Sequence, residues 1–282
     1  MQLLVAGYLG FVFTQIGFIG HDAGHREIFN SPRNNEILGL ICTLLVGVSY
    51  SWWTDTHNQH HRKPNQVDLD PAIDFPAPVF TEEQALSKKG FLKFIVKYQA
   101  YFFFPLMSLY PFSIWLNSTK FLYQNKVRYS LAEPVFVVTH YVLYFGLLFS
   151  LLGVSKGLLF VIVHYLLFGL YGGSVFASNH KGMPIVEKDE PLDFLYQQSL
   201  TSRNVKSHPL TDFWYGGLNY QIEHHLFPSM ARNKLRDAQK IVRPFFQAHS
   251  IPYYETSAIR SYWEILEYFH EVSAPLRLKE TE

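Results

Sequence analysis

The sequence predicts an all-α integral membrane protein in which several apolar helices carry a helical cap outside the bilayer. Hydrophobic residues make up 48% of the 282 residues, and charged residues only 17%, whereas ordinary soluble domains carry about a quarter charged residues. Aromatic residues reach 17%, which is typical of proteins with aromatic belts at the membrane surface. Long apolar runs occupy the first two thirds of the chain, and the last third has none that could span a bilayer.

Five apolar runs follow one another along the chain: Met1–Gly20, Ile37–Trp53, Tyr98–Leu116, Val135–Gly153 and Gly157–Ser178. Because a helix needs about 20 apolar residues to cross a bilayer, we expect spans at about 1–20, 135–153 and 157–178. The last two are separated by so few residues that they should form a tight hairpin. The third run contains Pro105 and Pro111, which interrupt helical hydrogen bonding, so we expect it to lie along the interface or in a broken helix.

The first apolar run, the last third of the chain, the net charge and the cysteine content further limit the classes of protein that fit this sequence. The first run lacks the basic start and the cleavage site of a signal peptide, so a membrane segment is expected there. Residues 181–282 mix charged and aromatic residues and are predicted to form the cap, with 1–282 as a single domain. The net charge of +1 gives no indication of nucleic-acid binding. The single cysteine, Cys42, cannot form an internal disulfide and is expected to be a buried apolar residue.

Three clusters hold most of the histidines that can carry chemistry. The first is His21 and His25, the second is His57, His60 and His61, and the third is Gln221, His224 and His225. Side chains three or four positions apart share one face of a helix. Each cluster can therefore direct two or three side chains at one point.

The positions of the clusters constrain the topology, because side chains that share metal ions must lie on one side of the membrane. A single apolar run separates His25 from His57, so Ile37–Trp53 should be re-entrant or in-plane. Three runs lie between His61 and His180, a further histidine that follows the fifth run. Since the last two of these runs form a hairpin, the run Tyr98–Leu116 should not cross the membrane. Most lysines and arginines flank the cluster side, whereas the hairpin loop has only Lys156. By the positive-inside rule the clusters face the cytoplasm.

The number of candidate ligands indicates the kind of metal site. A structural zinc ion is satisfied by four ligands, and the three clusters supply seven histidines and Gln221. Two ions of higher coordination number would use them all. An all-nitrogen, two-metal site beside a membrane points to iron and oxygen chemistry, whereas soluble di-iron bundles use glutamates and Glu-x-x-His pairs. We therefore predict a di-iron site held at the helical cap.

Other polar residues are assigned lesser roles. His140 and His164 lie within apolar runs and are expected to be packed or hydrogen-bonded residues. His208, His249 and His270 are expected at the surface or in loops. Carboxylates next to the clusters, namely Asp22, Asp55 and Glu223, are candidates to accept hydrogen bonds from ligating histidines. Candidate residues for lining an aromatic substrate tunnel are Tyr50, Trp52, Trp53 and Trp214, with membrane-interface anchoring as the alternative.

The three clusters resemble the ordered histidine boxes of membrane fatty acid desaturases. They read H-D-A-G-H, H-N-Q-H-H and Q-I-E-H-H, and the stretch Gly216-Gly-Leu-Asn-Tyr-Gln-Ile-Glu-His-His-Leu-Phe-Pro228 is especially similar. The resemblance covers about 18–262. Glutamine at the start of the third box is similar to the front-end desaturases, which act between an existing double bond and the carboxyl end.

The resemblance implies further features of the site and its partners. It implies a ligand just after the last membrane helix, which His180 matches, and it suggests supporting roles for Asn204 and Asn219. Gln221 is expected to act as a ligand directly or through water. The implied reaction uses O2 and two iron ions to introduce a cis double bond into an acyl-CoA or acyl-lipid. Since the chain has neither a dinucleotide fingerprint nor an H-P-G-G motif, electrons should come from a separate ferredoxin or cytochrome b5-type donor, for which the basic face offers a docking surface.

Two alternatives and one departure from the family pattern remain at this point. A lipid hydroxylase would use the same iron site, and a non-catalytic metal-binding membrane protein would need only the ligands. Family members usually have a polar N-terminal segment and one more membrane helix before the first box, whereas 20 residues precede His21 here. We therefore expect an incomplete N-terminus or a missing helix.

Overall fold

The computed structural model describes residues 1–190 and 192–278, and the chain folds there as two compact units. The first unit comprises Met1–His57 and Met107–Gly173, and the second comprises Asn58–Leu106 and the residues from Ser174 onward. Each unit is assembled from two separate stretches of chain. The prediction of one domain over the whole chain stays a prediction.

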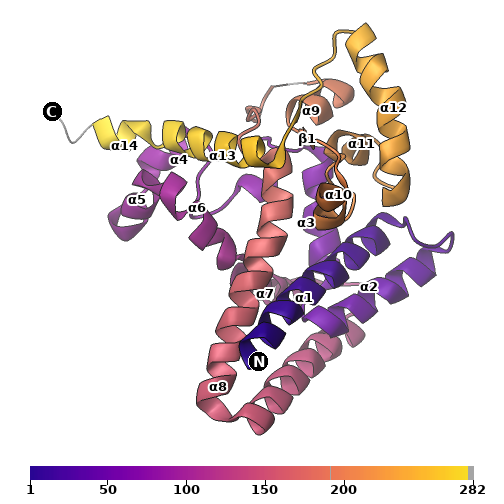
Figure 1. The fold of residues 1–282 in the computed structure, drawn as a ribbon, viewed down its shortest axis with the longest axis vertical. Helices are drawn as coiled ribbons and strands as arrows, with labels where there is room; N and C mark the ends of the chain where they lie inside the picture. Colours follow the sequence, from indigo (N-terminus) through magenta and orange to yellow (C-terminus); the bar gives the residue numbers. More distant parts are fainter. Residues whose placement is uncertain (191, 279–282) are drawn as a thin grey trace. The chain divides into compact units, whose positions relative to one another are not determined.

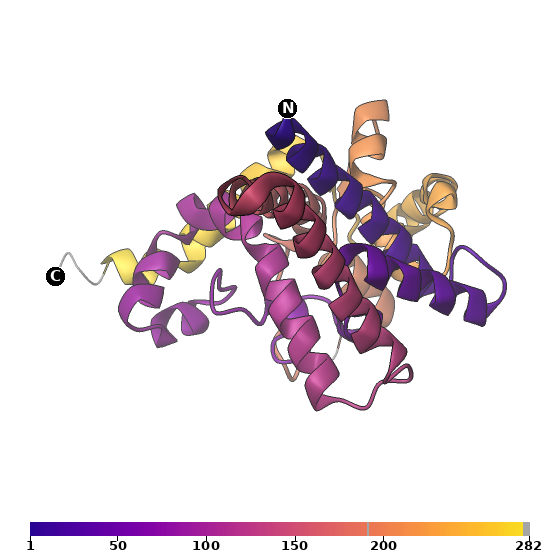
Figure 2. The ribbon, with the colours of Figure 1, turned by 90° about the horizontal axis from the view of Figure 1, so that it is seen from below.

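The regular secondary structure of the first unit is helical wherever the structure describes it, with loops between the helices (Figure 1). These are α1 (Gln2–His25), α2 (Pro32–Val46), the start of α3 (Tyr50–Arg62), α7 (Tyr110–Gln124) and most of α8 (Ala132–His180). The helices α1 and α2 lie side by side in both views (Figures 1 and 2). Ser31 caps the start of α2 through a hydrogen bond from the amide of Asn34, and Pro32 occupies its first turn, as is usual for helix starts.

The spans predicted near 135–153 and 157–178 correspond to the two arms of α8. Only Gly153 departs from helical geometry, with φ 70° and ψ 172°, and the chain changes direction there (Figure 1). Positive φ is accessible to glycine at little cost. The turn is therefore shorter than predicted, because Val154–Lys156, expected as the loop, is helical.

Two helices of the described chain, α1 and α8, are long and apolar enough to cross a membrane. A third candidate arises if α2 and α3, which are bent by 111° at their junction, count as one broken span. Such a bend fits a broken span and a re-entrant segment equally well, so the prediction that Ile37–Trp53 does not cross stays a prediction.

A buried carboxylate holds the junction between α2 and α3. Glu133 is fully buried at the start of α8. It accepts hydrogen bonds from the hydroxyls of Ser49 and Ser51, both at 2.6 Å, and from the amide of Ser51 at 2.7 Å. Because buried polar groups need partners, the three donors and the carboxylate stabilise one another within the first unit. The contact fixes the point from which α3 begins.

The third apolar run is a broken helix, as expected. It forms α6 (Gln99–Ser108), which contains Pro105, followed after Leu109 by α7, which has Pro111 in its first turn. Neither helix is among those long enough to span a membrane.

The second unit contains many short helices and one very short sheet. Besides the ends of α3 and α8, its helices are η1 (Pro71–Ile73), α4 (Glu82–Ser87), α5 (Gly90–Lys97), most of α6, α9 (Phe194–Leu200), α10 (Pro209–Tyr215), α11 (Gln221–Leu226), α12 (Arg232–Ala248), α13 (Ala258–Val272) and α14 (Ala274–Leu278). The strands β1 (Asn204–Val205) and β2 (Glu255–Thr256) pair in parallel. The all-α class is confirmed, apart from this two-residue pairing and an isolated bridge from Gln66 to Val186.

Two small cores organise the second unit. Val79, Ala85 and Val96 pack with Val272 and Leu276, which joins α4 and α5 to α13 and α14. Ile222 packs with Val242 and Phe246, which joins α11 to α12. The amphipathic pattern of α12 explains the second core, because its buried residues recur every three or four positions. The helix α11, which carries the third histidine cluster, is thereby fixed to a longer neighbour.

Candidate metal centre

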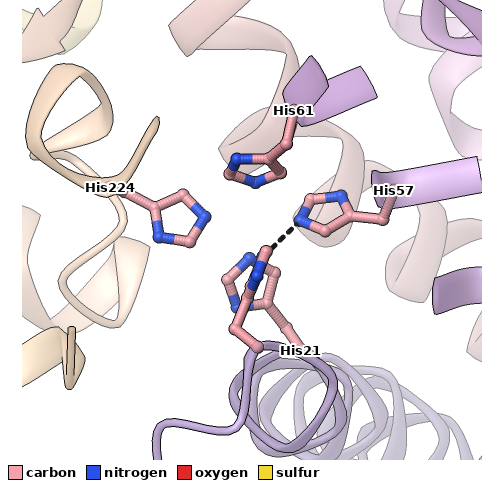
Figure 3. A group of neighbouring side chains, drawn as sticks. His21, His57, His61 and His224 are labelled. Atoms are coloured by element: carbon pink, nitrogen blue, oxygen red, sulfur yellow. Dashed lines mark hydrogen bonds between the residues drawn. The ribbon is translucent and has the colours of Figure 1, made fainter. Parts of the chain in front are cut away.

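The first unit brings together His21, His25 and His57. The two histidines of α1 are one turn apart, and their ring centroids lie 4.7 Å from each other. His57 Nε2 lies 2.9 Å from His25 Nε2, and Figure 3 shows the rings of His57 and His21 close together. The indole of Trp53 stacks on the His57 ring at 4.4 Å. Each of the three imidazoles has a ring nitrogen within 4.8 Å of one in the others, which is the spacing expected of shared metal ligands.

The second unit brings together His60, His180 and His225, which come from α3, the end of α8 and α11. All three are buried, and each offers a ring nitrogen within 4.8 Å of the others. The Nε2 atoms of His60 and His180 lie 3.3 Å apart, and the rings of His180 and His225 have centroids 4.6 Å apart. Residues far apart in sequence thus form one three-histidine cluster.

A buried carboxylate orients His60. Its Nδ1 lies 2.8 Å from Asp70 Oδ2. Burial alone would raise the pKa of Asp70, but the charge and hydrogen bond of His60 and the charge of Lys181 lower it to about 2. Since the carboxylate is ionised, it accepts a hydrogen bond from Nδ1–H, and the lone pair of His60 lies on Nε2.

The other two rings are oriented in the same way. His180 Nδ1 lies 3.0 Å from the carbonyl oxygen of Thr201, and His225 Nδ1 lies 2.8 Å from Gln198 Oε1. A carbonyl can only accept, so Nδ1 carries the proton in His180, and the amide oxygen of Gln198 sets the same tautomer in His225. Burial, together with the neighbouring imidazoles, holds the pKa of His225 well below its usual range, so this ring is neutral. Neutral imidazole with a free lone pair is the form that binds metals.

Three Nε2 lone pairs therefore point into one small buried region. Nε2 of His225 has no hydrogen-bond partner among the described residues, although buried ring nitrogens usually have one. A cation satisfies such a set of acceptors, and imidazole suits iron, zinc, copper and nickel. The donor set therefore fits a transition-metal ion.

The remaining two cluster histidines, His61 and His224, also meet in the second unit. Their ring centroids lie 4.7 Å apart with the ring planes at 82°, both are buried, and Figure 3 shows the two rings close together. The His61 ring stacks on His225 at 4.1 Å. Ring nitrogens of His61 and His224 lie within 4.8 Å of each other.

Gln221 lies beside the three-histidine cluster, but its oxygen is engaged elsewhere. Gln221 Oε1 accepts a hydrogen bond from Asn179 Nδ2 at 3.0 Å, and Asn179 Nδ2 also donates to the Leu218 carbonyl. The amide nitrogen of Gln221 consequently faces His180 Nε2 at 2.9 Å. An amide nitrogen is a hydrogen-bond donor, so it occupies the lone pair that a metal would use. The role of Gln221 as a ligand stays a prediction.

A second polar network positions α11. The Glu223 carboxylate accepts hydrogen bonds from Asn204 Nδ2 and from the Tyr253 hydroxyl, both at 2.7 Å, and Asn204 Oδ1 accepts from the Ile222 amide at 2.9 Å. Burial raises the pKa of Glu223, against the effect of these hydrogen bonds. Asn204 thus supports the segment that carries the third cluster.

The other predicted neighbours have different contacts. Asp22 Oδ1 lies 3.2 Å from His21 Nδ1, as expected of a carboxylate beside a ligand. Asp55 is exposed, and Asn219 donates to Val205 and Asp212. Of the tunnel candidates, Trp53 contacts His57 and His21.

The remaining aromatic candidates take part in local hydrogen bonds. The Tyr50 hydroxyl donates to the Ala23 carbonyl, the Trp52 amide donates to Ser49, and the Trp214 indole donates to Ser174. Their role in lining a tunnel stays a prediction.

The histidines assigned to other roles lie as expected. His140 and His164 are buried in the first unit and contact the Leu44 carbonyl and the Tyr144 hydroxyl. His208, His249 and His270 are exposed, and His208 caps the start of α10.

Sequence reasoning missed Asp70, Gln198 and Thr201. Asp70 comes ten positions after His60, and the other two lie on or just after α9. No helical spacing relates them to the clusters. The only signal was chemical, because ligating histidines need an acceptor for the second ring nitrogen.

Comparison with known proteins assigns the family. The sequence model of the family described as "Fatty acid desaturase" matches residues 1–257, close to the 18–262 estimated from the motifs. The acyl-lipid (9-3)-desaturase of Physcomitrium patens is 31% identical over 96% of this chain and 53% of that protein. The Delta(6)-fatty-acid desaturase fat-3 of Caenorhabditis elegans is 31% identical over 87% of this chain and 59% of that protein.

A third relative, the Delta(8)-fatty-acid desaturase 2 of Arabidopsis thaliana, is 26% identical over 93% of this chain and 61% of that protein. The chain thus spans between half and two thirds of the length of these relatives. The family match covers the cluster histidines of both units. The chain belongs to the fatty acid desaturase family.

Proposed function

We propose that this chain is an O2-dependent membrane fatty acyl desaturase that acts with two iron ions. The proposed direct ligands are His21, His25, His57, His60, His61, His180, His224 and His225, and Gln221 is proposed to act through water. Family membership supports the reaction class. The observation that carries the metal assignment is the set of Nε2 lone pairs from His60, His180 and His225, each fixed by an acceptor on Nδ1.

Iron, when bound, supplies the oxidising power for removing hydrogen from an unactivated methylene, which has no acidic proton for a base to take. The chain's own residues hold the ligands in one tautomer and keep water out. Asp70 is fully buried behind His60, and Gln198 is fully buried behind His225. Such partners raise the basicity of a ligating imidazole and fix its orientation.

The proposed product is a cis double bond in a long-chain acyl group. The curated relatives carry names with Delta(6), Delta(5) and Delta(8) regiochemistry, which supports a front-end position. Acyl-lipid appears in the name of the Physcomitrium patens relative. The proposal covers acyl-lipid and acyl-CoA substrates, and product analysis separates them.

Electrons are proposed to come from a separate ferredoxin or cytochrome b5-type donor, with the clusters facing the cytoplasm. Charge supports this orientation: the segments flanking the clusters are rich in Lys and Arg, including Arg62 and Lys63, whereas Lys156 is the only charge near the turn at Gly153. A basic cytoplasmic surface favours encounter with an acidic carrier.

The direct test expresses the full chain in a host that lacks the corresponding unsaturated acids, and locates new double bonds by mass spectrometry. His61→Ala and His224→Ala should abolish the product while the protein stays in the membrane. His249→Ala and His270→Ala are matched controls, since both histidines are exposed, and should keep full product formation.

The same experiment discriminates between the alternatives. A hydroxylated acid without a new double bond would favour the lipid hydroxylase. Zinc as the only metal in the purified protein, with no product, would favour a non-catalytic metal-binding protein. Undiminished product in either cluster variant would contradict the ligand assignment.

A further inference from the structure

The helix α5 has one packed side and one exposed apolar side. Val96 is fully buried in the core with Val79, Ala85, Val272 and Leu276, and α5 lies beside α4 and α14 (Figures 1 and 2). On the outer side Phe91 is 75% exposed, and Leu92 and Phe94 are also exposed. The packed side fixes the orientation of the helix. The outer side is therefore a built surface rather than the result of a loosely attached helix.

Lysines flank these apolar side chains. The sequence from Lys88 to Lys97 is K-K-G-F-L-K-F-I-V-K. No Asp or Glu oxygen of the described residues lies within 4.0 Å of the ammonium groups of Lys88, Lys89 or Lys93. Ion pairs within the described part of the chain therefore do not neutralise these three charges.

Few acidic residues lie near these lysines in the sequence, so the segment keeps an excess of positive charge. Glu82 and Glu83 precede the segment on α4, and Glu271 lies on α13, which contributes to the same core. No acidic residue occurs between Glu83 and Glu133. The apolar exposure continues onto α6, where Tyr101 is 72% exposed. We call Lys88, Lys89, Phe91, Leu92, Lys93, Phe94 and Tyr101 the α5 surface.

We propose that the α5 surface lies in the headgroup layer of the bilayer and binds anionic phospholipid headgroups. Aromatic and leucine side chains on a helix that is also rich in lysine are typical of helices lying in the membrane interface. Lysine stems can cover apolar surface while their ammonium groups reach the phosphates. The excess positive charge complements anionic lipids and not neutral ones. This inference does not depend on iron or on desaturase activity.

The test uses the full chain in nanodiscs of phosphatidylcholine, alone or mixed with phosphatidylglycerol. A nitroxide label is attached to Phe91→Cys in a Cys42→Ser background, and its accessibility to oxygen and to a water-soluble nickel chelate gives its depth. We expect the label to be oxygen-accessible and protected from nickel in the anionic discs. Lys88→Gln/Lys89→Gln/Lys93→Gln should return it toward water.

A second measurement needs no cysteine substitution. Phospholipids that co-purify with the wild-type chain from mixed membranes are extracted and quantified. Each lysine near an anionic surface contributes about a five-fold preference, and three such contributions multiply to roughly a hundred-fold at most. The triple variant should therefore lose at least about ten-fold of its enrichment in phosphatidylglycerol. The control Lys206→Gln/Lys234→Gln/Lys240→Gln removes the same charge from other exposed lysines of the second unit and should keep the enrichment.

Three results would overturn the proposal. The label could lie equally deep with and without phosphatidylglycerol, and the triple variant could leave its depth unchanged. This result would show that the surface contacts lipid without any preference for anionic headgroups. A label accessible to nickel in every disc would show that this face is in water. A label protected from both oxygen and nickel would show that protein, such as a second copy or another chain segment, covers it.

Discussion

His60 donates from Nδ1 to Asp70 across 2.8 Å, and the Asp70 side chain is fully buried. Asp70 also accepts from the backbone amides of Asn65 at 2.7 Å and Ala72 at 2.8 Å. The carboxylate thus ties the end of α3 to the loop that follows it. The lone pair of His60 then lies on Nε2, the atom that would bind a metal.

The first prediction concerns this carboxylate. Asp70→Asn should weaken iron binding roughly 10–100-fold, because partners behind ligating histidines typically contribute that much. Competition with a chelator, followed by elemental analysis of the purified protein, measures the change. Asp68→Asn is the matched control, since Asp68 is exposed and pairs with Lys188 at the surface. Equal iron retention in the two variants would mean that Asp70 does not orient a ligand.

The second prediction separates His180 from Gln221. His180→Ala should remove iron, because an imidazole lone pair is lost from the three-histidine cluster. Gln221→Ala should keep the iron content, because its amide nitrogen faces the same lone pair as a donor and its oxygen already accepts from Asn179. Iron per protein is counted in both variants. A loss of iron in Gln221→Ala as large as that in His180→Ala would instead establish Gln221 as a ligand.

The sequence predicts those contacts of the site that arise within one helix, because helical spacing is a local property. The pair His21 and His25 is recognisable because positions four apart lie on one face of a helix. The meeting of His60 with His180 spans 120 positions and was suggested only through the family resemblance. Nothing in the sequence links Gln198 to His225, because their contact depends on how α9 packs against α11.

The fold likewise contains elements that the sequence predicts and elements that it does not. Hydropathy identified α1 and both arms of α8, since membrane helices are continuous apolar runs. The parallel pairing of Asn204–Val205 with Glu255–Thr256 could not be predicted. Strands of two residues have no periodicity, and they form here where the Asn204 side chain is held by Glu223 and Tyr253.

The third prediction concerns the buried partner of Glu223. Tyr253→Phe removes the hydroxyl that donates to Glu223 at 2.7 Å and should lower the free energy of unfolding by about 1–3 kcal/mol, the usual cost of leaving a buried polar group short of a partner. Thermal or denaturant unfolding in detergent measures it. Tyr254→Phe is the control, because Tyr254 is partly exposed and contacts Glu264, which also pairs with Arg260. A wild-type stability in Tyr253→Phe would exclude this hydroxyl as a support of α11.

The fourth prediction compares two glycines of α1. A Cβ at Gly10 would lie 2.9 Å from the Phe168 amide nitrogen and 3.1 Å from the His164 carbonyl oxygen, whereas nothing lies within 4 Å of a Cβ at Gly17. Backbone atoms cannot move aside as a flexible side chain can, so Gly10→Ala should force α1 and α8 apart. Overpacking of this kind costs about 1–3 kcal/mol.

Gly17→Ala should instead leave stability unchanged or raise it by up to about 1 kcal/mol, since alanine is the better helix former. Both variants keep the charge, and both sites lie inside the same helix. The fraction of protein that stays monodisperse after heating measures the difference. Because close helix contacts in membranes depend on small residues, equal heat resistance of the two variants would contradict the close approach of α1 to α8 at Gly10.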